Sequence, residues 1–207
     1  MGDLFARLIP VSSSFSAQSQ QMAIPSSRIF SLRSSSRDQN ATALHLAGYP
    51  DMTLPVFSIT VHNTSKPNLL LFRGAPNASS PIGSARFHSL SSTTDVTLRG
   101  EPIRMKTSAL SGSFTIETPR QGSFKWHLNQ LTGTALELDD CEGRKIASLK
   151  YNSFGFGEKK LEIMVPCKEE FVEFIVMTGM VAKVLTGRMT EGSAEAAGGI
   201  FSTVVGV

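Results

Sequence analysis

The hydrophobic and polar positions of this chain follow two different periods. Between Leu54 and Val165, apolar residues alternate with polar ones in short runs, and Phe57, Ile59 and Val61 form the first of them. A period of two places apolar side chains on one face of a strand. From Phe171 to Leu185 the residues are apolar almost throughout, so a helix there is hydrophobic on every side and must be enclosed by protein. The pattern predicts a mainly β protein built around a C-terminal helix.

The alternating runs recur at short intervals, with Gly, Pro, Asn and Asp between them. We predict strands near residues 57–61, 69–72, 84–88, 95–99, 103–106, 113–117, 124–128, 136–138, 146–151 and 161–165. Short strands joined by turns are typical of an antiparallel sandwich or barrel, and closing the sheet removes exposed edges. The expected fold is therefore a closed antiparallel β-barrel of about 10–12 strands around a buried hydrophobic helix.

The same pattern divides the chain into three parts. Residues 1–50 are rich in serine and poor in apolar periodicity, which predicts a disordered leader whose loss should matter little. Its arginines and serines leave a mitochondrial targeting segment as the alternative. Residues 51–187 should form the barrel, with the central helix at about 168–186, and truncation before Phe171 should leave a hollow sheet. Residues 188–207 are rich in Gly and Ala and are expected to be a flexible tail.

Charge and composition narrow the classes of function. The net charge is +2 for residues 1–50, +2 for 51–186 and −1 for 187–207, so no broad basic surface for nucleic acid is expected. The apolar centre of the helix, residues 174–182, is too short to span a bilayer. The two cysteines cannot form a disulfide framework or, alone, a structural zinc site. Glu173 and Lys183 interrupt the apolar helix, and each should therefore lie near a barrel mouth, paired or reaching water.

The candidate binding residues are basic and lie on predicted strands. Arg104 and Lys106 are two positions apart, so they point out of the same face, and Arg99 and Lys125 could join them from nearby strands. Such a cluster could bind a lipid phosphate, while the alternative is an ordinary solvated face. The histidines have no metal-ligand spacing, and no catalytic motif stands out. We therefore predict no catalytic residues, no metal and no cofactor.

The order of strands and helix also resembles a known family. Together with residues 81–87 (PIGSARF), 122–126 (GSFKW) and 170–180 (EFVEFIVMTGM), it is similar to the tubby C-terminal-like superfamily. This group includes LURP-one-related proteins and phospholipid scramblases, and the chain looks like its uncharacterised fungal members over about residues 53–187. The resemblance implies a helix threaded through a barrel of about twelve strands, so that one or two strands should be hidden in the loops. It also implies binding of phosphoinositides or other lipids, although neither family's functional residues match this chain position by position.

Three functions follow, in order of preference. The first is a non-enzymatic domain that binds a phosphoinositide or another anionic lipid, or a protein partner, at the barrel surface. The second is a structural or protein-interaction module with no lipid role, and the third is an enzyme on a barrel scaffold. The first predicts a cytoplasmic protein that can associate peripherally with a membrane, without a transmembrane segment and without nucleic acid as a partner. Mitochondrial targeting is the alternative location.

Overall fold

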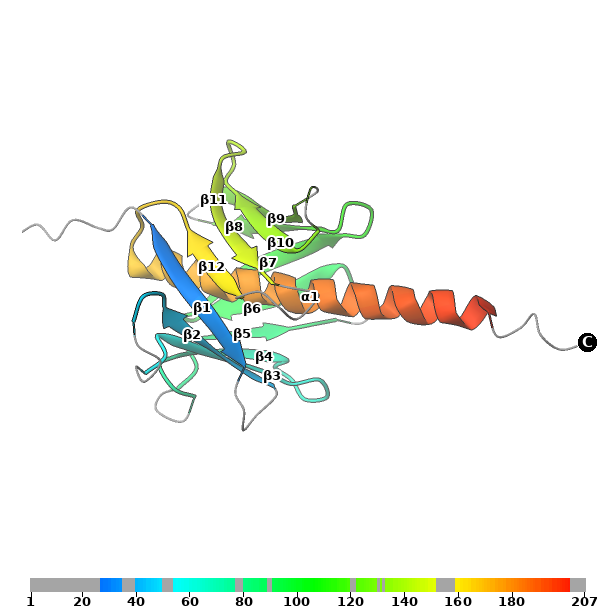
Figure 1. The fold of residues 1–207 in the computed structure, drawn as a ribbon, viewed down its shortest axis with the longest axis horizontal. Helices are drawn as coiled ribbons and strands as arrows, with labels where there is room; N and C mark the ends of the chain where they lie inside the picture. The colour runs from blue at the N-terminus through cyan, green and yellow to red at the C-terminus, as the bar shows by residue number, and fades with distance from the viewer. Residues whose placement is uncertain are drawn as a thin grey trace, which may run out of the picture.

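The protein folds into a closed twelve-stranded antiparallel barrel with one long helix along its axis (Figure 1). The computed structural model describes residues 27–34, 40–49, 54–76, 80–88, 91–119, 122–129, 131, 133–151 and 159–201, with side chains as far as Met189. The predicted fold class is confirmed, both in the closed barrel and in the C-terminal helix packed within it.

The strands follow one another around the barrel as a simple meander. They are β1 (Arg28–Ser34), β2 (Ala41–Leu46), β3 (Phe57–Val61), β4 (Leu69–Arg73), β5 (Gly83–Arg86), β6 (Thr93–Leu98), β7 (Glu101–Ser108), β8 (Ser113–Thr118), β9 (Gly122–Leu128), β10 (Ala135–Asp139), β11 (Lys145–Lys150) and β12 (Lys160–Ile163). Each strand pairs with its chain neighbours, and β1 also pairs with β12, which closes the sheet. All ten strands predicted beyond Leu54 are present as β3 to β12.

The barrel interior is filled by the apolar residues of the alternating pattern and by the helix. On β6 and β7, for example, Val96, Leu98, Ile103 and Met105 are buried while the residues between them face water. The polar residue Thr94 is also buried on this inward face. The largest fully buried side chains come from β1 to β4 and from β7 to β10: Trp126, Phe30, Phe57, Phe114, Leu44, Ile59, Leu69, Leu71, Met105, Ile116, Leu136 and Leu138. Period-two burial therefore places the polar strand residues on the outside of the barrel.

Helix α1 (Glu169–Phe201) occupies the barrel axis and begins with Glu169 and Glu170, whose carboxylates favour the positive end of the helix dipole. It approaches the wall closely at Gly179, where a Cβ would lie 3.0 Å from the Trp126 ring. The Trp126 indole N–H donates to Thr178 Oγ1 at 3.1 Å, and Thr178 donates to the Phe174 carbonyl at 2.8 Å. The only tryptophan in the chain therefore fixes the helix by one packed face and one polar contact.

The prediction that residues 1–50 form a disordered leader is wrong for part of that segment. Strands β1 and β2 both lie within it, and β1 seals the barrel between β12 and β2. The one or two further strands were expected in the loops of the barrel, and the structure has them in this N-terminal segment instead. Their apolar signal is short, because Phe30, Leu32 and Leu44 stand among serines, threonine and arginine. The expectation that loss of residues 1–50 matters little is overturned with it, since removing β1 and β2 opens the barrel.

The predicted helix bounds of about 168–186 are too short at the C-terminal end. The helix continues to Phe201, so the segment from residue 188 begins as helix and not as a flexible tail. In Figure 1 this last part projects beyond the strands, along the direction of the barrel axis. Alanine is the best helix former, and three alanines lie between residues 194 and 197, which favours continuation despite the glycines. Residues 202–207 lie outside the described part.

Candidate functional site

Arg104 lies on the outer face of β7, within a row of alternating charge. Strand pairing places Asp95 of β6 on one side of it and Glu117 of β8 on the other, and Arg86 of β5 lies next to Asp95. Opposite charges on neighbouring strands attract one another across a sheet. The two acids lower the local positive charge around Arg104, although their own contacts are with His88 and Lys106, so Arg104 alone does not make a basic patch.

Lys106 and Lys125 lie one step along the same face, where the row is less balanced. Lys106 of β7 pairs with Thr115 of β8, and Thr115 pairs with Lys125 of β9. Lys106 contacts Glu117 at 3.3 Å, with both side chains about half exposed. Asp139 is opposite Lys125 but receives a contact from His127 Nε2 at 2.8 Å. Within the described ranges Lys125 has no ion-pair partner. The structure thus brings Lys106 and Lys125 into one row and places Arg104 at its edge on the same face, which makes three of the four predicted residues.

Arg99 does not join this row and lies at the mouth where the helix begins. It occupies the β6–β7 turn with a φ of 50°, and its Nη2 donates to Glu173 Oε1 at 2.8 Å. The Glu173 side chain is 0 % exposed, whereas that of Arg99 is half exposed. The hydrogen bond and charge of Glu173 raise the pKa of Arg99. The structure therefore does not bring Arg99 together with the other three predicted residues, and its Nε and Nη2 already donate to the buried carboxylate.

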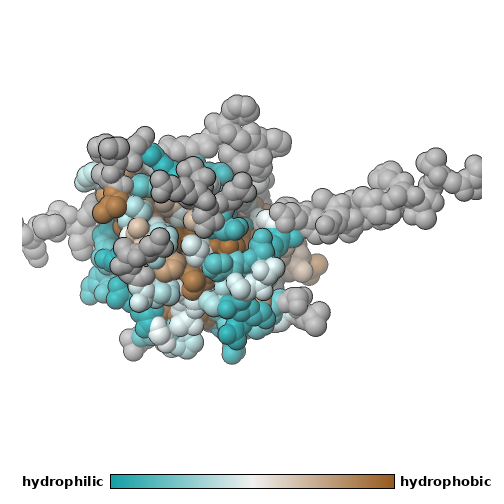
Figure 2. All heavy atoms as spheres, turned by 90° about the horizontal axis from the view of Figure 1, so that it is seen from below, coloured by the Kyte–Doolittle hydropathy of each residue, from teal (hydrophilic) through white to brown (hydrophobic). Residues whose placement is uncertain are grey.

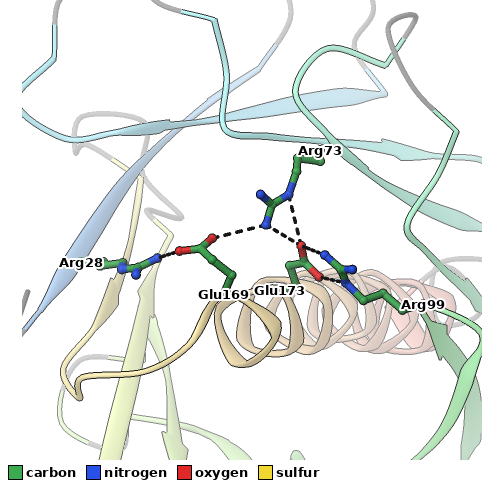
Figure 3. Close-up of polar contacts among 5 residues, drawn as sticks. All are labelled: Arg28, Arg73, Arg99, Glu169 and Glu173. Atoms are coloured by element: carbon green, nitrogen blue, oxygen red, sulfur yellow. Dashed lines mark hydrogen bonds and ion pairs between the residues drawn. The ribbon is translucent and has the colours of Figure 1, made fainter. Parts of the chain in front are cut away.

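Two further arginines complete this mouth, which we call the arginine mouth (Arg28, Arg73, Arg99, Glu169 and Glu173; Figure 3). Arg73 at the end of β4 donates to Glu173 Oε1 at 2.7 Å and contacts Glu169 at 3.3 Å, and Arg28 of β1 also binds Glu169. Burial alone would raise the pKa of Glu173, but hydrogen bonds from Arg99 and Arg73 outweigh it and hold that pKa below its usual range. The cluster ties the first turns of the helix to three strands or strand ends.

The opposite end of the barrel, where the helix leaves, has a different composition. We call it the exit mouth, defined by Asn63, Lys183, Val184, Gly187 and Arg188, which line a cavity of about 470 Å³. Burial lowers the pKa of Lys183, and the nearby charge of Lys159 lowers it further. The prediction that Glu173 and Lys183 lie near barrel mouths is confirmed, with the difference that only Glu173 has an ion-pair partner among the described residues.

Two other cavities flank the arginine mouth. One of about 330 Å³ is lined by Leu98, Arg99, Glu101, Pro102, Ile103, Thr118, Pro119, Glu170 and Phe174. The other, of about 600 Å³, is lined by Ser27, Arg28, Ile29, Phe30, Leu46, Ala47, Tyr49, Val56 and Glu169. The charged residues that line both cavities either belong to the arginine mouth or are acids next to it. On the described part of the face in Figure 2, hydrophilic residues predominate and hydrophobic ones are scattered between them.

The remaining reactive side chains do not converge. His88 and His127 contact Asp95 and Asp139 respectively, each at 2.8 Å, on the outer surface of the barrel. Burial raises the pKa of the Cys167 thiol, which makes the reactive thiolate less available. Within the ranges that the structure describes, no group of three His, Cys, Asp or Glu residues could hold a metal ion. No helix in that part of the chain is long and apolar enough to cross a membrane.

Sequence reasoning missed Arg73 and Arg188. Arg73 could have been sought, because an acid within an apolar helix demands a cation and Arg73 stands at the end of the apolar run 69–72. Arg188 follows the last apolar turn and was assigned to the tail. No protein-family model, curated protein or solved structure matches this chain. The class that the fold defines is a closed antiparallel barrel filled by its own C-terminal helix.

Proposed function

We propose that this protein is a non-catalytic module that binds the surface of an anionic membrane through the outer face of β7–β9. The observation that carries the proposal is the row of Lys106, Thr115 and Lys125 across three neighbouring strands. Strands lie about 4.8 Å apart, so the two lysines start about 10 Å from each other with a hydroxyl between them. Two ammonium groups and one hydroxyl suit the phosphate groups of lipid headgroups. The resemblance to the tubby C-terminal-like superfamily points the same way.

The filled interior supports a surface site. Helix α1 buries its apolar residues against the barrel wall, with Ile175, Val176 and Val181 completely enclosed. A ligand that enters the barrel would have to displace this helix, whereas the outer face is available without any rearrangement. Arg104 adds to the face at its edge, but Asp95 and Glu117 reduce its contribution. We therefore expect modest affinity that depends strongly on salt.

Vesicle co-sedimentation tests the proposal. The full chain is mixed with phosphatidylcholine vesicles that contain no anionic lipid, phosphatidylserine or a phosphatidylinositol bisphosphate. Anionic vesicles should bind and neutral ones should not. Each lysine near an anionic surface contributes about 1 kcal/mol, so Lys106→Met/Lys125→Met should weaken partitioning by about 30-fold.

The matched control is Lys150→Met/Lys168→Met, which makes the same change in net charge at two exposed lysines outside the row. Its binding should stay within about threefold of the unaltered protein. Equal loss in both double variants would show only a general charge effect and would reject the site. Equal recovery with neutral and anionic vesicles would reject lipid recognition and favour the protein-interaction module.

A further inference from the structure

The exit mouth contains two cations that no described carboxylate neutralises. Lys183 projects from helix α1 where the helix leaves the barrel, and within the side chains described here it has no hydrogen bond or ion pair. Desolvating an ammonium group without a partner is unfavourable. The charge of Lys159, which precedes β12, has the same sign and makes the position less favourable still. An anion at this point would offset both costs.

Arg188 is held beside Lys183 by an aromatic ring and not by an acid. Its guanidinium carbon lies 4.6 Å from the centroid of Phe87, which follows β5. A guanidinium that stacks on a ring keeps its N–H groups, which lie in its plane, free to donate. Lys183 and Arg188 line the same cavity, together with Val184 and Gly187 from the helix and Asn63 from the β3–β4 loop. The cavity therefore presents an ammonium, a guanidinium and an amide.

Both walls of this cavity are fixed by one buried residue, Asn68. Its side-chain amide donates to the carbonyls of His62 and Ser65, at 3.3 Å each, which holds the loop that carries Asn63. Its side-chain oxygen accepts from the Phe87 backbone N–H at 2.8 Å, which holds the ring under Arg188. Asn68 is only 5 % exposed. The backbone that carries Asn63 and the ring on which Arg188 stacks are thus fixed before any ligand arrives, which lowers the entropic cost of binding.

We propose that the exit mouth is a binding site for a phosphate-bearing anion, held by Lys183, Arg188 and Asn63. The guanidinium and the ammonium would each donate to phosphate oxygens, and the Asn63 amide would add a neutral donor. The cavity, at about 470 Å³, has room for a small organic phosphate or for the headgroup of a phospholipid. This site lies on a different part of the molecule from the Lys106–Lys125 row and does not depend on it.

Gly187 offers a way to fill the site without disturbing the fold. A Cβ built at this glycine meets no atom within 4 Å, so a side chain there would extend into open space. Leucine is also a far better helix former than glycine, by roughly 0.8 kcal/mol. Gly187→Leu should therefore fold at least as well as the unaltered chain while occupying the cavity. It complements Lys183→Met, which removes the charge and keeps the length of the side chain.

Two titrations of the full chain test the proposal, one with inorganic phosphate and one with phosphatidylcholine vesicles that contain phosphatidic acid. Nuclear magnetic resonance would follow the backbone amides of Asn63, Gly187 and Arg188, with sodium chloride at equal ionic strength as reference. Phosphate should shift these amides saturably, and Lys183→Met and Gly187→Leu should each weaken binding by at least about tenfold. Lys168→Met, an exposed lysine at the other end of the barrel, should leave it unchanged.

The two arms distinguish the source of the phosphate. Binding of inorganic phosphate supports a free anion, and an effect of both variants that is confined to phosphatidic acid vesicles supports a lipid headgroup. The proposal is overturned if neither probe shifts the three amides beyond the chloride reference. It is also overturned if Lys183→Met and Gly187→Leu, shown to be folded by their thermal transitions, bind as the unaltered protein does.

Discussion

Each mouth of the barrel has an arginine stacked on a phenylalanine ring, but the hydrogen-bond donors of the two arginines differ in their partners. At the arginine mouth Arg73 lies over the ring of Phe57, 5.9 Å from its centroid, and at the exit mouth Arg188 lies over Phe87 at 4.6 Å. The donors of Arg73 are then taken by Glu173 and Glu169. Those of Arg188 meet no acid among the described side chains. Arg73 therefore forms ion pairs within the fold, whereas the donors of Arg188 remain available to a ligand.

This difference indicates that the arginine mouth stabilises the fold, whereas the exit mouth can bind a ligand. The arginine mouth has three arginines around Glu169 and Glu173, with Glu170 beside them, so its charges balance and its donors are used (Figure 3). A ligand there would have to compete with a buried carboxylate. The exit mouth has two cations and a cavity, and the helix reaches it only after its apolar contacts are complete. Clustered charge indicates a site only where the fold has not already neutralised it.

The largest expected effect comes from removing the cations of the arginine mouth. In Arg73→Met/Arg99→Met the Glu173 carboxylate stays buried without a partner. Breaking a buried ion pair from one side costs about 3–5 kcal/mol, and we expect a loss of free energy of unfolding in that range. Urea denaturation followed by Trp126 fluorescence would measure it, since the indole contacts the same helix.

The control for this variant is Arg104→Met, which removes an arginine from the outer face. Surface ion pairs contribute about 0–1 kcal/mol, so its free energy of unfolding should change little. A loss below about 1 kcal/mol in the double variant would mean that water reaches Glu173. In that case the arginine mouth would be no more closed than the exit mouth, and the comparison between them would fail.

A smaller effect is expected when Glu173 itself loses its charge. Glu173→Gln keeps one acceptor but turns an amide donor towards arginine donors, which should cost about 1–3 kcal/mol at neutral pH. The folded pKa of Glu173 lies below its usual value of 4.5, so the carboxylate stabilises the fold above that value and the contribution is lost as pH falls through the folded pKa. The difference between the two proteins should therefore narrow in acid.

Denaturation at a series of pH values from neutral to acidic would measure this narrowing. Glu137 and Asp140 also have lowered pKa values, but both residues are present in both proteins and cancel in the difference. A gap that stays constant with pH would show that the charge of Glu173 adds nothing to stability. The arginine mouth would then be a packing feature only.

The barrel and its helix could be predicted from the sequence because burial repeats along them. Ten strands showed the period of two, and the helix showed apolar residues on every side. Strands β1 and β2 were missed since Phe30 and Leu32 are separated by a serine that is itself buried, in a segment whose composition suggests disorder. Their position is decided by closure, because β1 pairs with both β12 and β2. Local pattern does not contain that information.

The sites were less predictable, because partners lie far apart in the chain. Arg99 was grouped with Arg104 and Lys106 from its proximity in sequence, yet its partner Glu173 is 74 residues away. The helix places Glu173 and Lys183 at opposite mouths, and their positions in the apolar run did predict that each lies near a mouth. Which arginines meet them depends on strand order and turn geometry, as the φ of 50° at Arg99 shows. The sequence shows which residues are charged, but it does not show which of them form ion pairs.

The smallest expected change in the free energy of unfolding is at the exit mouth, and it is a gain instead of a loss. Lys183→Met removes an unpaired, largely buried ammonium, so the free energy of unfolding should rise, by about 1 kcal/mol at neutral pH. The folded pKa of Lys183 lies below its usual value of 10.5, so the unfolded chain binds this proton more firmly and the unaltered protein gains stability as pH rises towards 10.5. The gain in the free energy of unfolding of Lys183→Met over the unaltered protein should therefore shrink over that range.

Chemical denaturation at neutral and alkaline pH would measure this gain, with Lys168→Met as the exposed-lysine control. A loss of stability in Lys183→Met at neutral pH would mean that the ammonium is already satisfied within the fold, and the exit mouth would then resemble the arginine mouth.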